Sequence, residues 1–208
     1  MQLRDVVKRA KPDILIGLST VKDLFTEEIL AYIADNQEPG RRPLIFPMSN
    51  PTSCSECTAE ATQRATRGRA IFASGSPFPD VEYDGRVIAS SQSNNMYFFP
   101  GVALGAQLGH TKVVSDRMLM AAAEAIPEQL TAEDIARGRV YPKLHNIREI
   151  SANIAVRVMQ AAYEDGHLYG KAKRRLEAGE VELKRFILDM MFDPKYKDLV
   201  YRDPGVGE

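Results

Sequence analysis

Three short apolar segments, each ending in small polar residues, constrain the fold of this chain more than any other feature. They cover residues 13–17, 44–46 and 70–73, and helix-like segments separate them. Their spacing of about 30 residues is the length of a β-strand–helix–β-strand unit with parallel strands. Strands that are buried on both faces appear as continuous apolar runs. The pattern predicts an α/β fold with a Rossmann-like parallel sheet.

The residues directly after these segments are uncharged and polar or small. They are Gly17 to Ser19, then Ser49 and Asn50, then residues 74–76. Right-handed crossovers bring the carboxyl ends of parallel strands to one edge of the sheet, where ligands bind in open α/β folds. An asparagine there can donate and accept hydrogen bonds without carrying charge. The three ends together predict a binding site, although Asn50 taken alone is better explained as a cap of the next helix.

A hairpin and a second polar cluster follow the third segment. Residues 81–88 alternate in polarity around an Asp-Gly pair, which predicts a β-hairpin. The acids of this hairpin imitate the start of a calcium loop, but Ser91 stands where that motif needs Glu. The cluster at 91–95 ends in Asn94 and Asn95, just before an aromatic run and a helix of small residues. The asparagine pair marks either a turn or a surface that faces a substrate.

The rest of the chain is predicted to be helical. Apolar periodicity and capping residues indicate helices at 115–125, 131–138 and 147–166, and the more charged segment 167–208 is predicted to form a helical tail. The fold class is therefore α/β, with a partial parallel sheet followed by a helical carboxyl-terminal region.

Composition excludes several classes of function. The net charge of −1 among 208 residues gives no support for nucleic-acid binding, which requires a basic surface. No apolar run approaches the roughly 20 residues that cross a bilayer, so no membrane partner is expected. Cys54 and Cys57 form a single C-x-x-C pair, and a structural zinc site needs four ligands. No metal ligand is assigned within this chain.

Several longer motifs resemble those of malic enzymes. The resemblance runs in order from about Pro12 to about Gly166, and the tail beyond carries much less of it. The motifs are Ser49-Asn50-Pro51-Thr52, Glu56-Cys57-Thr58-Ala59-Glu60, the segment 72–78, Asn94-Asn95, Phe99-Pro100-Gly101, the segment 138–142 and the segment 150–155.

The resemblance implies oxidative decarboxylation of L-malate to pyruvate and CO2, with NAD or NADP and with Mg²⁺ or Mn²⁺. It implies that Asn50 lies at the malate and the nicotinamide, and that Asn94 or Asn95 binds malate. The turn Gly17, Leu18 and Ser19 matches a segment that lines the dinucleotide. Whether NAD or NADP is preferred cannot be read from this chain.

Other parts of a malic enzyme have no counterpart here. The family's proton-transferring Lys and Tyr, its metal-binding acids and its glycine-rich phosphate turn lie upstream of the matched region. Ser93 also replaces the Gly or Ala that usually precedes the asparagine pair. We therefore expect the carboxyl-terminal part of a malic enzyme, inactive alone, with residues 1–166 in the NAD(P)-binding domain. The alternatives are a non-catalytic dinucleotide-binding or assembly module and a malolactic-type enzyme.

The resemblance also sets the expected partners. L-malate is the small-molecule partner, and the family usually forms homo-oligomers, either dimers or tetramers. The compartment stays open between cytoplasm and mitochondrion.

Overall fold

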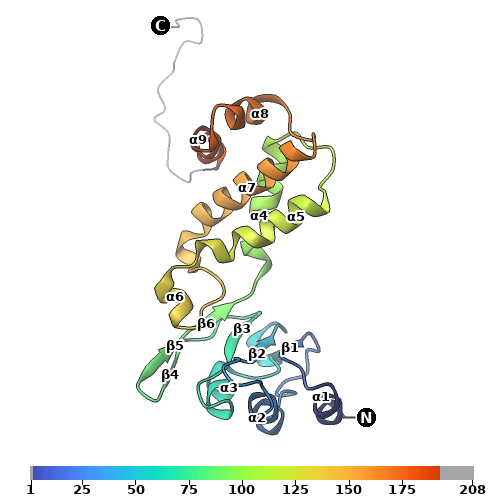
Figure 1. Cartoon of the computed structure of the whole chain (residues 1–208), viewed down its shortest axis with the longest axis vertical. Coiled ribbons are helices and arrows are strands. Elements are labelled where there is room, and N and C mark those ends of the chain that lie inside the picture. The colour runs from blue at the N-terminus through green and yellow to red at the C-terminus, as the bar shows by residue number, and fades with distance from the viewer. Residues whose placement is uncertain (1, 193–208) are drawn as a thin grey trace, which may run out of the picture.

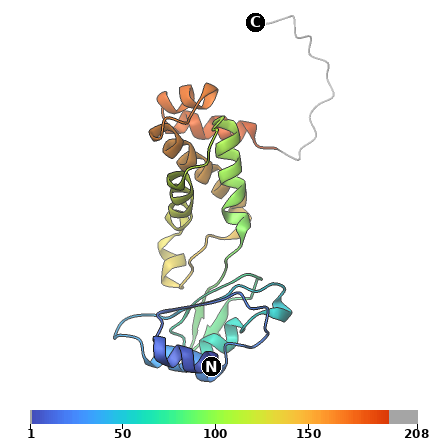
Figure 2. The same ribbon diagram turned by 90° about the vertical axis from the view of Figure 1, so that its right-hand side faces the viewer.

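The computed structural model describes residues 2–192. The molecule is elongated, with an α/β lobe that holds the amino-terminal half and a helical lobe that holds the carboxyl-terminal half (Figures 1 and 2). Each lobe has its own cluster of buried apolar side chains.

A four-stranded parallel sheet forms the centre of the α/β lobe. Its strands are β1 (Ile14–Gly17), β2 (Leu44–Pro47), β3 (Ile71–Ser74) and β6 (Ser90–Gln92), in the spatial order β1-β2-β3-β6. All three strand pairs are parallel, which confirms the predicted fold class. The sequence did not predict β6, because its three residues are polar and resemble a turn.

Three helices cover one face of this sheet (Figure 1). They are α1 (Leu3–Ala10), α2 (Glu27–Asp35) and α3 (Ala59–Ala65). Thr26 and Thr58 cap α2 and α3 by accepting a hydrogen bond from the third backbone amide of each helix. Residues such as Leu15, Ile45 and Phe72 point to this covered face and are buried.

The opposite face of the sheet is open at β1. Ile14 and Ile16 are 49% and 56% exposed, and Leu18 just beyond the strand is 77% exposed. β1 is also an edge strand, so within residues 2–192 no strand pairs with its outer side. An apolar strand face and a free strand edge therefore lie side by side.

The predicted hairpin is confirmed. β4 (Val81–Tyr83) pairs in antiparallel fashion with β5 (Arg86–Ile88), and it projects from the side of the lobe (Figure 1). Asp84 and Gly85 at its tip both have positive φ angles, 50° and 67°, as a tight two-residue turn requires.

Helices α4 (Phe99–Leu108), α5 (Asp116–Ala125) and α7 (Ile147–Glu164) build the helical lobe, with the short α6 (Ala132–Ala136) beside the sheet. Glycines let α4 approach α7 closely, since a Cβ atom at Gly101 would lie 2.6 Å from Cβ of Ile154. None of the helices within residues 2–192 is long and apolar enough to cross a membrane.

Two further helices, α8 (Gly170–Glu177) and α9 (Glu180–Met190), complete the lobe. Leu183 and Ile187 of α9 are fully buried in the same cluster as Ile154 of α7. The division into residues 1–166 and a tail 167–208 stays a prediction, and the last part of that tail lies outside the described residues.

Candidate ligand-binding site

The carboxyl ends of β1 and β2 are joined by hydrogen bonds. The backbone amide of Met48 donates to the carbonyl oxygen of Gly17 at 2.8 Å. One step further, the amide of Thr20 donates to the hydroxyl of Ser49 at 2.9 Å. The turns that follow the two strands therefore lie against each other.

The same edge continues through β3 and β6. The hydroxyl of Ser76 donates to the side-chain oxygen of Asn50 at 2.6 Å, which ties the turn after β3 to the turn after β2. The amide of Ser93 donates to the carbonyl oxygen of Ser74 at 2.8 Å. The prediction that the polar strand ends share one edge of the sheet is thus confirmed, with β6 as an additional member.

The side chain of Glu56 holds together the turns that follow β1 and β2. Its side chain is fully buried, and its carboxylate accepts hydrogen bonds from the amide and hydroxyl of Ser19 at 2.8 and 2.9 Å. The hydroxyl and amide of Ser49 also donate to it, at 2.5 and 3.4 Å. Burial raises the pKa of the Glu56 carboxyl, but these donors favour the anion and hold the pKa below its usual value. Glu56 is a buried anion.

The Glu56 carboxylate limits which residues can occupy the turn after β1. A Cβ atom at Gly17 would lie 2.6 Å from Cδ of Glu56 and 2.7 Å from Cζ of Phe25, so packing requires glycine there. The Ser19 hydroxyl donates to Glu56 and accepts from the amide of Val21 at 3.2 Å. Of the three residues predicted to line the dinucleotide, Leu18 exposes its side chain most openly.

Asn50 is exposed at the start of the turn after β2. One hydrogen bond fixes the orientation of its side-chain amide. Its carbonyl oxygen accepts from Ser76. Within the described part of the chain, its NH2 group forms no hydrogen bond. The peptide bond between Asn50 and Pro51 is cis.

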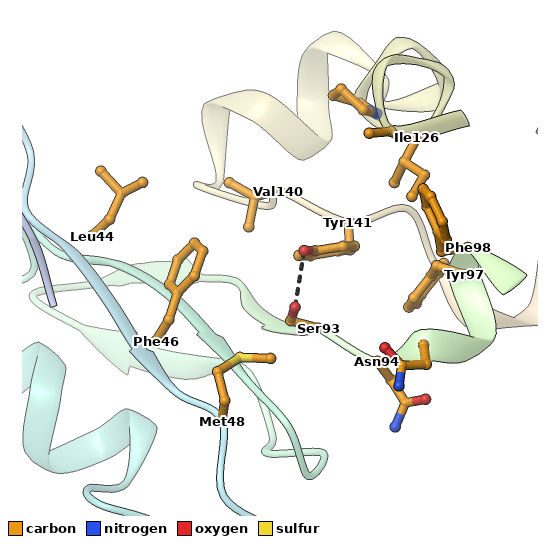
Figure 3. A pocket seen from close by; sticks show the side chains of 13 residues that line it. Leu44, Phe46, Met48, Ser93, Asn94, Tyr97, Phe98, Ile126, Val140 and Tyr141 are labelled. Atoms are coloured by element: carbon orange, nitrogen blue, oxygen red, sulfur yellow. Dashed lines mark hydrogen bonds between the residues drawn. The ribbon is translucent and has the colours of Figure 1, made fainter. Parts of the chain in front are cut away.

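A cleft of about 430 Å³ opens between the open face of the sheet and the helical lobe (Figure 3). Side chains of β2 form its floor, and residues at the end of α5 and before α7 form its other walls. Figure 3 shows Phe46 and Met48 facing Val140 and Tyr141 across it. Most of its lining is apolar.

Asn94 and Asn95 supply the amide groups of this cleft. The side-chain oxygen of Asn94 accepts from the amide of Met96 at 3.0 Å and caps a short 3-10 helix. Asn50 does not line the cleft. It lies farther along the same edge of the sheet, so the structure brings the asparagine pair beside β2 and leaves Asn50 next to Ser76.

Sequence reasoning missed two residues of this region. Both Glu56 and Tyr141 stand within the motifs that resemble malic enzymes, but the sequence alone assigned neither of them to the site. The Ser93 hydroxyl donates to Tyr141 Oη at 2.9 Å across the cleft (Figure 3).

Metal-ligating side chains do not gather here. Among residues 2–192, no group of three or more His, Cys, Asp or Glu side chains converges in a way that could hold a metal ion. Cys54 and Cys57 are free thiols, and burial raises the pKa of Cys57 to about 12.

Comparison with known proteins identifies the family that this chain resembles. Residues 1–163 match the family model described as malic enzyme, NAD binding domain. An NADP-dependent malic enzyme of Populus trichocarpa is 51% identical over 164 residues, which cover 79% of this chain and 27% of that protein.

Two further relatives extend the match toward the carboxyl terminus. An NADP-dependent malic enzyme of Vitis vinifera is 45% identical over 195 residues, 94% of this chain and 32% of that protein. A mitochondrial NAD-dependent malic enzyme of Solanum tuberosum is 39% identical over 205 residues, 96% of this chain and 32% of that protein. The chain thus spans about a third of the length of these relatives.

Proposed function

This chain belongs to the malic enzyme family, and from that membership we propose that it supplies part of a site for oxidative decarboxylation of L-malate with NAD or NADP. In this proposal, Asn50 and one of the two residues Asn94 and Asn95 bind the carboxylate groups of malate. The turn formed by residues 17–19 lies against the dinucleotide.

The orientation of two asparagine amides is the observation that carries this proposal. Asn50 and Asn94 each use the side-chain oxygen to accept a hydrogen bond from the protein. Each NH2 group is then left to donate. A carboxylate only accepts hydrogen bonds, so two pre-oriented amide donors suit a dicarboxylate. Their neutrality suits a reaction in which one carboxylate leaves as CO2.

Only some groups of the turn after β1 are available to contact the dinucleotide. The Ser19 side chain is occupied by Glu56, so contact with the cofactor would come from the exposed Leu18 side chain and from backbone atoms. When bound, the dinucleotide supplies the hydride acceptor. The protein's part is to hold the turn still, which Glu56 does.

The residues described here do not fit a metal centre. We therefore assign no metal ligand to this chain. In this proposal, the ligands of Mg²⁺ or Mn²⁺ and the proton-transferring Lys and Tyr lie in parts of a malic enzyme outside the sequence of this chain. The open face at Ile14 and Ile16 supports this division, because an apolar strand face beside a free edge suits further strands and helices.

A chimaeric enzyme tests the proposal. In the Vitis vinifera relative, the matching 195 residues would be replaced by this chain, and malate-dependent reduction of NADP and NAD would be measured with Mn²⁺. We expect activity from the chimaera and none from the 208-residue chain alone. Asn50→Ala, and at least one of Asn94→Ala and Asn95→Ala, should lower kcat/KM for malate by a factor corresponding to about 1–3 kcal/mol.

Lys112→Ala, a change at an exposed loop residue outside this region, serves as the matched control and should leave kcat/KM unchanged. An active chimaera whose kcat/KM is unchanged by all three asparagine substitutions would remove these residues from the malate site. A folded but inactive chimaera would favour a non-catalytic module.

A further inference from the structure

Four arginine side chains line one cleft at the amino ends of β2 and β3, away from the asparagine-bearing edge. The cleft encloses about 270 Å³. Arg42 precedes β2, Arg69 precedes β3, Arg86 begins the β5 strand of the hairpin, and Arg137 follows α6. These residues come from four separate parts of the chain.

Backbone contacts fix the frame of this arginine cleft. Arg42 donates to the carbonyl oxygens of Arg69 and Ala70 at 2.9 and 3.2 Å, which joins the starts of two strands. The amide of Ala89 donates to the carbonyl oxygen of Arg137 at 2.8 Å. The hairpin is therefore tied to the segment after α6, and the guanidinium groups are carried by fixed elements.

The charge of the cleft is only partly balanced. No carboxylate is among its lining residues. Arg69 lies 3.4 Å from Asp35 and Arg137 lies 3.6 Å from Asp80, but each of these acids also pairs with a second arginine outside the cleft. Arg137 also lies 3.7 Å from Glu133, a side chain that is 79% exposed.

Arg42 and Arg86 have no carboxylate partner within 4.0 Å among residues 2–192. Burial lowers the pKa of Arg42, and the positive charge of Arg86 lowers it further. Both positively charged side chains line the same cleft. Arg42 uses only two of its five N–H donors in the hydrogen bonds to Arg69 and Ala70.

From this arrangement we propose that the arginine cleft binds a multiply charged oxoanion, either a phosphate compound or a polycarboxylate. Guanidinium groups present planar pairs of donors that match carboxylate and phosphate oxygens. An anion between Arg42 and Arg86 replaces their mutual repulsion by two attractions. The site lies apart from Asn50 and Asn94, and the proposal is independent of malate chemistry.

Isothermal titration calorimetry of the purified 208-residue chain would test this. Pyrophosphate and citrate are the two probes, each titrated at an ionic strength matched with NaCl. We expect saturable binding at one site for at least one probe. Binding of pyrophosphate alone identifies a phosphate ligand, and binding of citrate alone identifies a polycarboxylate ligand.

Arg86→Gln is the decisive variant, because Arg86 is exposed and forms no ion pair within the described residues. Affinity should fall by more than about ten-fold, which is the scale of one lost charged contact. Arg117→Gln is the control. It removes the same charge from an exposed side chain that pairs with Glu164 and Asp165 on the helical lobe, and it should leave affinity unchanged.

Two results would overturn the proposal. One is the absence of saturable binding by either probe at millimolar concentration, in a chain shown to be folded by circular dichroism. The other is equal binding by the Arg86→Gln variant and the unaltered chain. The melting temperature gives a second readout, which the bound probe should raise in the unaltered chain and in Arg117→Gln but not in Arg86→Gln.

Discussion

Glu56 and Ser19 lie 37 positions apart in the chain, yet the carboxylate of Glu56 accepts from both the amide and the hydroxyl of Ser19, at 2.8 and 2.9 Å. Because Ser49 donates to the same carboxylate, one buried anion holds the ends of β1 and β2 together. The order of this edge of the sheet thus depends on a fully buried residue.

Glu56→Ala should therefore destabilise the protein. It leaves the buried donors of Ser49 and the partly buried hydrogen bonds of Ser19 without their acceptor, and we expect a loss of about 2–3 kcal/mol in the free energy of unfolding. Urea denaturation measures this. Glu124→Ala, at an exposed position of α5, should change stability by less than about 0.5 kcal/mol. Equal effects of the two changes would contradict the role of Glu56.

Stability should also depend on pH through Glu56. Its pKa is lower in the folded protein than in the unfolded chain, so the unfolded state binds more protons as pH falls. The contribution of Glu56 is fully present above its ordinary pKa and is lost as pH falls through its folded pKa. Urea midpoints between pH 7 and pH 3 should fall less steeply for Glu56→Gln than for the unaltered chain. Parallel curves would show that Glu56 does not titrate in this way.

Gly101→Ala should disturb the contact between α4 and α7. The new Cβ atom would lie 2.6 Å from Ile154 and 2.9 Å from the carbonyl oxygen of Ser151, and such overpacking costs about 1–3 kcal/mol. Thermal denaturation measures the loss. Gln107→Ala lies on the exposed side of the same helix and should be nearly neutral. A stable Gly101→Ala variant would mean that the two helices can separate freely.

The two thiols should differ in reactivity. Burial raises the pKa of Cys57 to about 12, so almost none of it is thiolate at pH 8, and the thiolate is the reactive form. Iodoacetamide followed by peptide mass spectrometry should label the half-buried Cys54 in the folded chain and label both residues in 8 M urea, a concentration on the order of that used to unfold small domains. Labelling of Cys57 first would contradict its burial.

Ser76→Ala should weaken malate binding in the chimaeric enzyme without touching the ligand. Its hydroxyl fixes the amide of Asn50, so loss of the hydroxyl lets that amide rotate and should raise KM for malate several-fold while kcat changes little. Ser53→Ala, at an exposed position of the same turn, should leave KM unchanged. An unaltered KM in the Ser76→Ala variant would show that malate binding does not depend on the orientation of the Asn50 amide.

Local sequence predicted the regular elements well where the signal lies within one segment. Short apolar runs predicted the strands β1, β2 and β3, and the capping residue Ser115 marked the start of α5. The hairpin came from Asp84 and Gly85. Each of these signals needs only neighbouring residues, because capping and turn geometry are local properties of the backbone.

Strand β6 could not be found in this way. Ser90 and Ser91 carry no apolar signal, yet they are 8% and 1% exposed. They form a strand because β3 offers a parallel partner, with Ala73 opposite Ser91. Pairing with a strand distant in the sequence overrides the weak intrinsic preference of such a segment.

The sequence by itself determined the alternation of strands and helices, the placement of Asn50 after a strand and the motifs that resemble malic enzymes. The tertiary structure alone decided that Glu56 joins two turns, that Asn94 borders a cleft while Asn50 lies beside Ser76, and that Arg42 and Arg86 line one cleft. The reason is physical: periodicity and turn residues act along the chain, whereas these contacts join segments whose meeting depends on strand order and on the packing of whole elements.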